Sequence, residues 1–420
     1  MSEKSEQIIE HLFRTEYGKL VSILTHIFGT SYIQLAEDIV QDTLIAALNH
    51  WSVDGIPENP TGWLVQVAKR KVLNELKRKK IILQHHNAGN VPEYSDSDID
   101  AVFLENEIED SQLRMIFTCC HPSLNTESQV ALTLKTLCGF GVKEVANALL
   151  TSESTINKRL YRAKKTIRET NLPFTIPQGK ELETRLNTVI LTLYLLFNEG
   201  YNSSSSDSII KKELCLEALR LAKLLAEHFE ENGELCALIS LMCFHIARFE
   251  GRLDDRSAII LFEDQDRSLW NKELISKGMQ YLKMSMKSTS LSSYHIEASI
   301  AGQHCMADSF ENTNWLNIYD QYVLLKSVKP NPIIDLNLAI IQSKIDGLKT
   351  SLEMLNKLSQ KEILNDYYLL PATQGIFNMK LENYSEAINF LETALSLNPS
   401  ETESEFLEKK IRECKKLAPG

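Results

Sequence analysis

The sequence lacks any run of about 18 consecutive apolar residues, so it predicts no membrane-spanning helix. Its first four residues, Met-Ser-Glu-Lys, lack the basic-then-apolar pattern of a secretion signal. The eight cysteines have no paired spacing, which is typical of reduced thiols in a cytoplasm. Cys119, Cys120 and His121 have no second ligand pair at zinc spacing, and small buried thiols at a helix end explain them better. We therefore expect a cytoplasmic protein without metal or cofactor.

An enzyme is the least supported class, because no nucleophile–base set and no phosphate-binding loop is apparent. The carboxylates at 263–266 could suggest acid–base chemistry, but a surface network that joins the C-terminal extension to the N-terminal domains, or a plain helix start, explains them better. Asp266 is a candidate cap for a helix that begins near Ser268. The segment 198–201 is predicted to be either a helix C-cap with Gly200 left-handed or a contact loop. The contact candidates in these two segments are Asn198, Glu199, Tyr201, Glu263, Asp264, Asp266 and Arg267.

A net charge of −11 argues against a protein that coats nucleic acid, but the charge is unevenly distributed. Residues 69–80 contain seven basic side chains and one acidic one, and residues 154–168 contain six basic and no acidic ones. Between them, residues 93–110 contain eight acidic side chains and no basic one. One basic stretch alone would be read as a solvated helix face. Two such stretches, each ending a helical unit, indicate two contacts with nucleic acid.

The hydrophobic pattern predicts an all-α chain of two or three domains, since 420 residues exceed one compact core. Apolar residues from Ile9 to Ile27 recur at steps of three and four, which predicts a helix that ends near Gly29. A second helix spans about 33–48, and a Pro/Gly-rich loop at 54–60 precedes a third over about 61–80. Residues 81–106 have no apolar period and are predicted to form a flexible acidic linker.

A helix-turn-helix is predicted at 142–165, after a helix capped near Asn125. The helix 142–150 leads through a turn at 151–153 into a second helix, 154–169, that is rich in basic and amide side chains. Ile156 and Leu160 are expected to face the core. The alternative is an ordinary helical hairpin with a basic outer face. The predicted base contacts are Thr155, Asn157 and Lys158, and the predicted phosphate contacts are Arg159, Arg162, Lys164 and Lys165.

The segment 144–164 resembles region four of bacterial sigma factors, which reads the −35 promoter element. Residues 36–43 (AEDIVQDT) resemble region 2.2, and residues 60–71 (PTGWLVQVAKRK) resemble regions 2.3 to 2.4, which open and read the −10 element. No region three lies between them, as in the extracytoplasmic-function group. The resemblance implies that core RNA polymerase and promoter DNA are the partners and that no bond chemistry is catalysed.

The resemblance also assigns roles to residues. Core polymerase contacts are implied for Asp38, Gln41 and Asp42. Residues 49–51 lie where the family has a loop that captures a flipped base, and Trp63 would lie at the edge of the melted DNA. A plain core position is the alternative for each tryptophan. The candidate −10 contacts are Asn49, His50, Trp51, Trp63, Lys69, Arg70, Asn74 and Arg78, of which the last four would steer the strand by charge. The acidic linker could mimic RNA in a positive channel or be a plain spacer.

From about residue 179 onward, the pattern predicts helix after helix. Gly375, Tyr384, Ala387, Leu391, Ala394 and Pro399 have the spacing of a tetratricopeptide (TPR) unit, and a weaker copy surrounds Ala339 and Leu355. Segments 117–124, 196–201 and 261–270 resemble the sigma subgroup with a TPR-like extension. In that subgroup the extension stands in for a separate anti-sigma protein, so a regulatory protein or the chain's own sigma domains are possible partners.

The predicted organisation is region 2 at 1–80, the linker at 81–106, region 4 at 107–172 and the helical-repeat extension at 180–420. The function predicted from these parts is that of a sigma factor regulated by its extension. Two alternatives remain, a one-component helix-turn-helix regulator with a repeat sensor and a repeat scaffold with incidental basic helices. The first 80 residues argue against the regulator, which needs neither an acidic docking helix nor a second basic helix.

Overall fold

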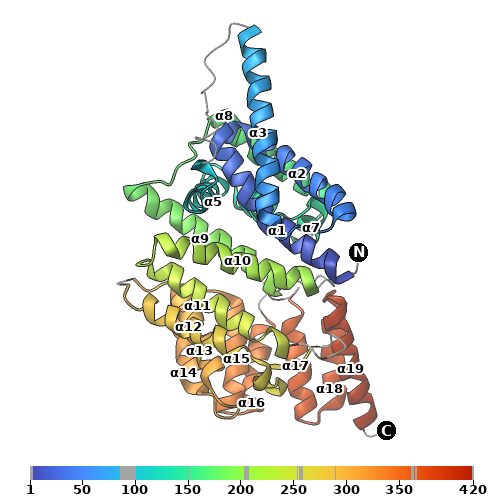
Figure 1. Cartoon of the computed structure of the whole chain (residues 1–420). Helices are drawn as coiled ribbons and strands as arrows, with labels where there is room; N and C mark the ends of the chain where they lie inside the picture. Colours follow the sequence, from blue (N-terminus) through green and yellow to red (C-terminus); the bar gives the residue numbers. More distant parts are fainter. Residues whose placement is uncertain are drawn as a thin grey trace. The chain divides into compact units, whose positions relative to one another are not determined.

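The computed structural model describes residues 3–85, 101–149, 151–202, 208–252, 254, 259–288, 290–360, 364 and 367–418. Regular structure in these residues is helical, as the periodicity predicts (Figure 1). The chain divides into two compact units, residues 1–196 and 197–420. Among the described helices, none combines the length and the apolar character that a bilayer crossing requires.

The first three helices of unit 1 begin and end at signals that the sequence contains. Helix α1 (Glu3–Phe28) ends at Gly29, whose φ of 88° is open to glycine but strained for other residues. Helix α2 (Ile33–Asp54) follows a 3-10 turn, η1 (Thr30–Tyr32), and ends at Gly55, with a φ of 82°. Helix α3 (Pro60–His85) begins with a proline, whose fixed φ suits the first turn. It runs five residues beyond the predicted end at residue 80, and residues 86–100 lie outside the described part.

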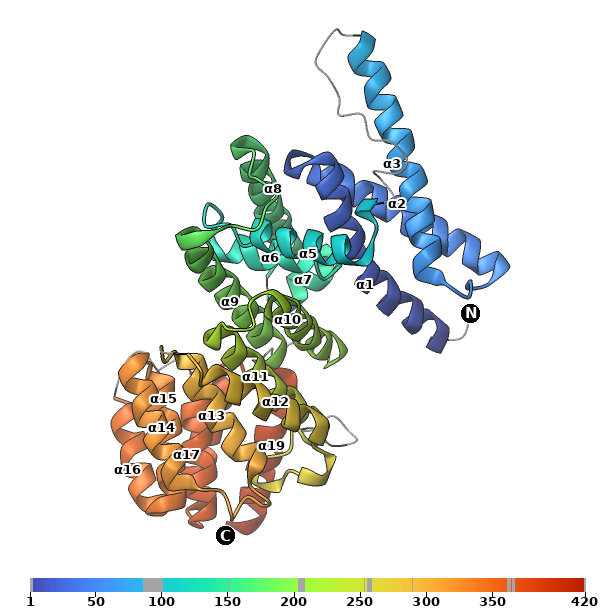
Figure 2. The same cartoon turned by 60° about the vertical axis from the view of Figure 1, so that its left-hand side comes forward.

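Four further helices form the part of unit 1 that was predicted to be region 4. Helix α5 (Glu105–Cys119) leads to α6 (Thr126–Thr136), where Asn125 Oδ1 accepts a hydrogen bond from the Ser128 amide at 2.8 Å. Helix α7 (Val142–Ala148) is followed by α8 (Glu153–Thr170). The hydrogen bond from the Ser128 amide to Asn125 confirms the predicted cap at Asn125. Figure 2 shows α5, α6, α7 and α8 gathered beside α1.

The core of unit 1 is shared by helices from both predicted domains. Tyr17, Leu20 and Leu24 of α1 are at most 4% exposed, and α1 packs against α2 and α5. Burial of each such side chain stabilises the fold by about 1.5–3 kcal/mol. At Gly18 the contact between α1 and the end of α6 is so close that a Cβ would lie 2.0 Å from the Leu137 carbonyl oxygen.

Helix α9 (Gly179–Asn202) continues past the predicted end of a helix at Gly200. The prediction of a left-handed Gly200 is wrong, since this buried residue lies within the helix and has no positive φ. The helix continues because Tyr201 packs in the next turn, with its ring 5.8 Å from that of Phe197 and 4.3 Å from that of His245. These contacts outweigh the cost of about 1 kcal/mol for a glycine inside a helix.

Unit 2 is a succession of helices that pack on their neighbours in the sequence (Figure 1). The first five are α10 (Ser208–His228), α11 (Gly233–Ala247), α12 (Lys272–Ser285), α13 (Ser293–Met306) and α14 (Trp315–Val328). The last five are α15 (Pro332–Ile345), α16 (Leu348–Leu358), α17 (Leu369–Lys380), α18 (Tyr384–Ser396) and α19 (Glu401–Leu417). Where α17 meets α18, a Cβ on Gly375 would lie 2.7 Å from Leu391 Cγ, so the glycine permits the close approach that its spacing predicted.

Candidate nucleic-acid interface

Helices α7 and α8 form the predicted helix-turn-helix. The turn is fixed by Ser152, whose hydroxyl accepts a hydrogen bond from the Thr155 amide at 3.2 Å and so caps α8. Ile156 and Leu160 are 0% and 6% exposed, so both face the core as predicted. At its other end, α8 stops at Asn171, a residue in the left-handed conformation that amide side chains tolerate.

The outer face of α8 presents cations and amides to solvent. Asn157, Lys158, Arg162 and Lys165 are exposed, and Thr155 is partly exposed. A face of this composition on the second helix of a helix-turn-helix is suited to base edges and phosphates in the major groove. The sequence reasoning missed Tyr161, which is 65% exposed on the same face. The available signal was its spacing, three residues after Lys158 and four before Lys165.

Three of the predicted phosphate contacts have acidic partners. Lys165 Nζ lies 3.7 Å from Glu169 Oε1 in an exposed pair within α8, whereas Arg159 and Lys164 pair with other helices. Arg159 Nη2 lies 2.5 Å from Glu127 Oε2, at the start of α6. Lys164 Nζ forms an ion pair with Glu37 of α2 and donates a hydrogen bond to Gln34 Oε1 at 2.8 Å. In this conformation neither Arg159 nor Lys164 is available to a phosphate without breaking an ion pair, so their DNA roles stay predictions.

The predicted base-capturing segment is helical. Residues 49–51 form the last turns of α2, and Trp51 is 3% exposed, so the core alternative holds for Trp51. Its ring lies 5.5 Å from that of Phe13 and 5.6 Å from that of Trp63. Asn49 and His50 are exposed, and the His50 ring lies 5.4 Å from the half-buried Trp63 ring. Asn49, His50 and part of the Trp63 ring are therefore accessible to solvent, whereas the Trp51 ring is not.

The basic side chains of α3 extend away from this aromatic cluster. Arg70, Asn74 and Arg78 are exposed, and Arg78 Nη1 lies 3.6 Å from Glu75 Oε2 in the preceding turn. Lys69 is partly buried, with its Nζ 5.0 Å from the centre of the Phe103 ring, a cation–π contact. In Figures 1 and 2 the second half of α3 projects beyond the helices around it.

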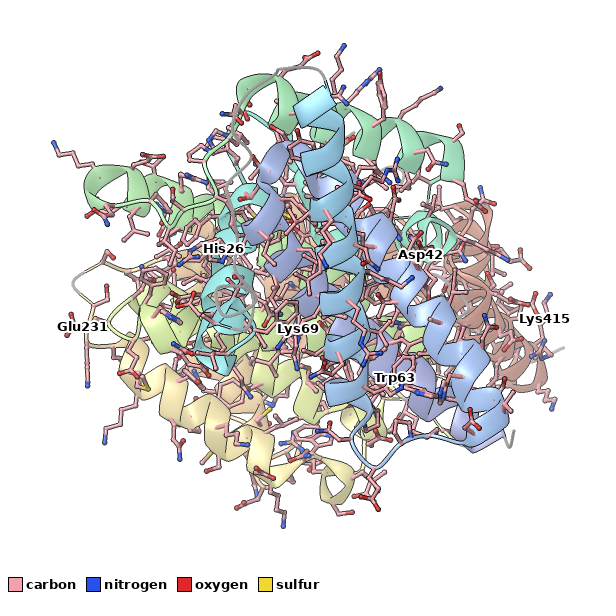
Figure 3. All side chains as sticks on the ribbon, turned by 45° about the horizontal axis from the view of Figure 1, so that its top comes forward. His26, Asp42, Trp63, Lys69, Glu231 and Lys415 are labelled. Atoms are coloured by element: carbon pink, nitrogen blue, oxygen red, sulfur yellow. The ribbon has the colours of Figure 1, made fainter. Side chains whose placement is uncertain are left out.

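The polar face of α2 is open. Asp38, Gln41 and Asp42 are exposed, and Figure 3 labels Asp42 on α2 together with Trp63 and Lys69 on α3. Ile45, which the sequence reasoning missed, and Leu48, which it counted in the apolar repeat of residues 33–48, are 54% and 44% exposed on the same helix. Their spacing from Gln41, four and seven residues, was the available signal. An acidic face that ends in exposed apolar side chains is suited to a protein partner.

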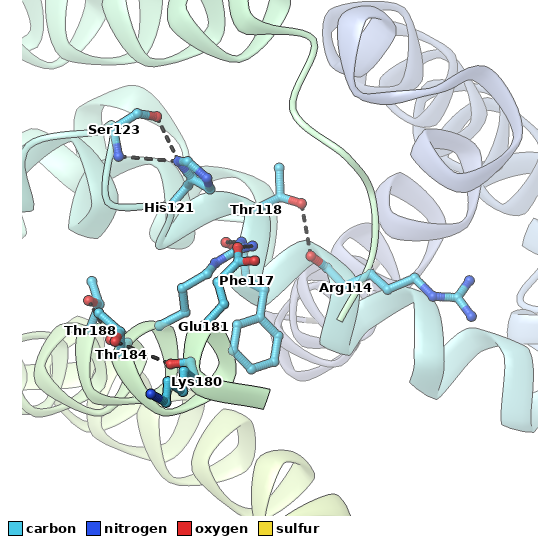
Figure 4. A network of polar contacts seen from close by, with 10 residues as sticks. Arg114, Phe117, Thr118, His121, Ser123, Lys180, Glu181, Thr184 and Thr188 are labelled. Atoms are coloured by element: carbon cyan, nitrogen blue, oxygen red, sulfur yellow. Dashed lines mark hydrogen bonds and ion pairs between the residues drawn. The ribbon is translucent and has the colours of Figure 1, made fainter. Parts of the chain in front are cut away.

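Helix α9 is attached to α5 and α6 by buried polar contacts, part of which Figure 4 shows. The Arg185 guanidinium donates from Nη2 to the Phe117 carbonyl oxygen at 2.7 Å and lies 5.7 Å from the Phe117 ring centre. Thr192 donates to Gln129 Oε1 at 3.3 Å, and Gln129 in turn donates to the His121 carbonyl at 3.0 Å. The first part of α9 therefore completes the core around α5 and α6.

The Cys119–Cys120 thiols lie buried at the end of α5, as predicted. Burial raises the pKa of Cys119 well above its ordinary value and that of Cys120 to about 11, so both stay protonated at neutral pH. A protonated thiol is a poor metal ligand and a poor nucleophile. Among the described residues, no three potential metal ligands cluster together.

Glu263 and Arg267, two of the contact candidates, form contacts within unit 2. Glu263 forms ion pairs with Lys344 of α15 and Lys380 of α17. The Arg267 guanidinium donates to the carbonyl oxygens of His304, at 2.8 Å, and Ala307, at 2.5 Å. Asp266 caps a 3-10 turn, η4 (Arg267–Leu269), by accepting from the Ser268 amide at 2.8 Å, so its predicted capping role is confirmed. Contacts with the sigma-like half stay predictions for all seven candidates, including Asn198, Glu199, Tyr201 and Asp264.

Family comparisons agree with this arrangement. The chain matches Sigma-70 region 2 over residues 12–81, Sigma-70, region 4 over 114–167, and a family of unknown function, DUF6596, over 185–286. It is 26% identical over 138 residues to the ECF RNA polymerase sigma factor SigL of Mycobacterium tuberculosis (strain ATCC 25618 / H37Rv), covering 32% of this chain and 73% of SigL. The chain belongs to the ECF-type sigma factors. This sigma factor carries a DUF6596 extension, and it is 30% identical over 384 residues to an uncharacterized protein of Rhizobium meliloti (strain 1021), with 89% of each chain covered. No solved structure matches.

Membership in this family has direct consequences. An ECF-type sigma factor directs transcription initiation, binds core RNA polymerase and promoter DNA, and is not an enzyme. The match to region 2 over 70 residues of the first half also counts against the one-component regulator, which would bind DNA through α7 and α8 alone. The DUF6596 match begins at Arg185, whose side chain packs in unit 1.

Proposed function

We propose that this sigma factor docks on core polymerase through α2, reads the −35 element with α8 and opens the −10 element with α3 and the end of α2. The observation that carries the proposal is the exposed basic and amide face of α8, beyond a capped turn, in the same chain as the projecting basic helix α3. Asp38, Gln41 and Asp42 would contact polymerase, with Ile45 and Leu48 adding apolar area.

At the −35 element, Asn157, Lys158 and Thr155 would meet base edges, while Arg162 and Lys165 would meet phosphates. At the −10 element, Trp63 with Asn49 and His50 would receive an unstacked base, and Trp51 would support the Trp63 ring from below. Lys69, Arg70, Asn74 and Arg78 would guide the strand by charge. Work on the chromosome would place the protein in the cytoplasm.

We further propose that the extension is a TPR-like helical-repeat domain that controls the sigma half, either by contacting it or by receiving a partner protein. Support comes from the Gly375 contact with Leu391, and from Ala387 and Ala394, which are fully buried at the predicted repeat positions. Domains of residues 1–80, 107–172 and 180–420 remain the working division, with the first part of α9 packed on α5 and α6.

The deciding experiment is transcription in vitro with purified core polymerase, comparing the full chain with a version that ends at Asn202. A cut near Pro177 would remove Arg185 and Thr192 and expose the core around Phe117, so it would confuse misfolding with regulation. Output from the shortened form alone would mean that the extension inhibits, and output that needs the full chain would mean that it is required. No initiation and no polymerase binding by either form would refute the proposal.

A further inference from the structure

Two arginines of unit 2 are partly buried without a carboxylate partner. Arg248 and Arg252 flank η2 (Phe249–Gly251), the 3-10 turn directly after α11. The Arg248 guanidinium donates to Gln265 Oε1 at 3.3 Å, and its Nε is buried without a hydrogen-bond partner. The Arg252 guanidinium donates to the Tyr201 carbonyl oxygen at 3.4 Å. Among the residues that the structure describes, neither arginine forms an ion pair, so most of the five N–H donors on each guanidinium have no protein partner.

A third arginine nearby has the partners that a structural role requires. Arg267 donates to the carbonyl oxygens of His304 and Ala307, and to Thr313 Oγ1 at 3.5 Å. The position of Arg248 at the end of α11 is favourable for a cation because of the helix dipole. The dipole does not satisfy the remaining donors, however, and a desolvated cation without acceptors is unfavourable. The fold therefore explains Arg267 but leaves the donors of Arg248 and Arg252 unexplained.

Aromatic rings fix the planes of these two guanidinium groups. The guanidinium carbon of Arg248 lies 4.3 Å from the centre of the Phe262 ring and 5.3 Å from that of Trp270. That of Arg252 lies 4.1 Å from the centre of the Tyr201 ring. A guanidinium stacked by its face keeps the N–H groups at its edge available to a planar acceptor. This orientation is the one that a bidentate bond to a carboxylate requires.

Neutral polar groups complete the cluster. The His245 ring lies 4.3 Å from the Tyr201 ring, and its Nδ1 is buried without a hydrogen-bond partner. Burial, together with the charges of Arg248 and Arg252, lowers the pKa of His245 to about 3, so this ring is neutral at pH 7. From α14, the Tyr322 hydroxyl interacts electrostatically with Tyr201 and Arg248. The end of α9, the end of α11 and α14 thus surround two cations whose charge is not balanced locally.

We propose that Arg248 and Arg252, with the aromatic rings around them, form a carboxylate-binding site for an acidic peptide segment of a partner protein. The binding follows from unit 2 alone, and only its regulatory consequence rests on the proposed function. The two cations match a segment with two carboxylates, each held by one guanidinium. Tyr201, Phe262 and Tyr322 are partly exposed, so they offer apolar contact to the peptide residues beside those carboxylates.

A peptide suits this site better than a nucleic-acid strand or a small anion. The exposed carboxylates of Asp308 and Glu311 act on the charge of the neighbouring Arg267, and they would repel a strand that carries a phosphate at each nucleotide. A small anion could bind the guanidinium groups but would leave the aromatic rings uncovered. A peptide segment can neutralise both guanidinium groups and also cover the rings.

The site can be tested by titrating the full-length chain into a labelled random copolymer of glutamate and tyrosine. This probe offers carboxylates beside aromatic rings in many registers, and fluorescence anisotropy measures its binding. The double variant Arg248→Gln, Arg252→Gln is expected to bind at least about tenfold more weakly than the wild type. The control Arg412→Gln removes an exposed arginine of α19 that is paired with Glu408, and it should bind as the wild type does. No binding by the wild type, or an equal loss in the control, would overturn the proposal.

Two competitors distinguish the source of the anion. Oligothymidylate is expected not to displace the copolymer from the wild-type chain, and citrate is expected to displace it only at a much higher concentration. Displacement by oligothymidylate that also depends on Arg248 and Arg252 would make this a nucleic-acid site. Binding of citrate as tight as that of the copolymer would make it a site for small carboxylates. Either result would refute the assignment to a peptide.

Thermal unfolding without any ligand separates a binding role from a structural one. Arg248→Gln is expected to leave the midpoint of unit 2 unchanged or to raise it, because it removes a cation that has no anionic partner. Arg267→Gln is expected to lower the midpoint, because it removes the bonds to His304, Ala307 and Thr313. An equal fall in both variants would show that Arg248 is structural and would contradict the site. None of these measurements uses polymerase or promoter, so a wild-type chain that directs no initiation refutes the proposed function and not the site.

Discussion

Replacement of Arg185 by alanine should destabilise unit 1 strongly, although this residue lies outside the region 4 match. The Phe117 carbonyl belongs to the last turn of α5, where carbonyl groups have no partner within the helix. Arg185 Nη2 donates to that carbonyl at 2.7 Å, and its positive charge lies at the negative end of the helix dipole. The substitution removes both contributions and leaves a buried acceptor without a partner.

The expected loss can be worked out from these contacts. A hydrogen bond from a charged donor to a buried carbonyl contributes about 1.5–3 kcal/mol. The ion pair with Glu181, at 3.2 Å, adds only about 0–1 kcal/mol because the Glu181 side chain is 64% exposed. The Arg185 Nε is buried and has no hydrogen-bond partner in the described structure, which limits the total. Arg185→Ala should therefore cost about 2–4 kcal/mol, a large part of the roughly 5–15 kcal/mol that stabilises a typical domain.

Urea unfolding of the full chain, with hydrogen exchange of the α5 and α6 amides as the local probe, measures this loss. The amides of α17 and α18 in unit 2 provide an internal control and should keep their protection. Glu181→Gln should cost less than about 1 kcal/mol, and Arg185→Lys should fall between the two because it keeps the charge but not the planar fork. If the α5 amides of the Arg185→Ala variant are as well protected from hydrogen exchange as those of the wild type, Arg185 contributes nothing to the stability of unit 1. The structural link between α9 and region 4 is then refuted.

Three further predictions concern DNA binding, packing and pH. Lys158→Ala should weaken binding to −35 DNA by about 1–3 kcal/mol in a titration at fixed salt, and unchanged affinity would remove the recognition role from this helix face. Gly18→Ala should lower the thermal midpoint because its Cβ would meet the Leu137 carbonyl, whereas Gly62→Ala would meet only the movable Asn59 side chain and should be tolerated; equal midpoints would contradict the close approach. Burial and neighbouring arginines lower the pKa of His245 and His304 to about 3, so the unfolded chain binds more protons between pH 3 and 6.5 and unit 2 should lose stability as the pH falls. Each histidine lowers the free energy of unfolding by up to about 1.4 kcal/mol for each pH unit of acidification in this range. His304→Gln should therefore reduce the dependence of unit 2 stability on pH, as measured by calorimetry, and an unchanged dependence would mean that His304 is not buried in its neutral form.

The helices and the helix-turn-helix were predictable from sequence because they depend on local signals. Gly29 ends α1, and Asn125 and Ser152 cap α6 and α8 through bonds that span only three residues. The inward positions of Ile156 and Leu160 follow from a period of 3.6 residues. The same reasoning was wrong at Gly200, because the aromatic packing of Tyr201 with His245 stabilises a further helical turn.

The candidate DNA-binding face was only partly predictable because charge alone does not show whether a side chain is free. Lys158 and Lys164 look alike in the sequence, yet Lys158 is exposed and Lys164 is paired with Glu37. Trp51 and Trp63 look alike as well, but Trp51 is buried beneath Phe13 and Trp63. In each case the deciding contact comes from another helix, so no local pattern contains it.

A charged residue on an apolar helical stripe can nevertheless be recognised as a long-range contact. Glu37 lies four residues after Ile33 on the buried stripe of α2, and Arg185 lies four before Val189 on that of α9. Periodicity therefore implies that both charges are buried, and the cost of an unpaired buried charge implies that each has a partner. The partners, Lys164 and the Phe117 carbonyl, lie 127 and 68 residues away along the chain. Sequence spacing can thus predict that such contacts exist, while the fold alone determines that one joins region 2 to region 4 and the other joins region 4 to the extension.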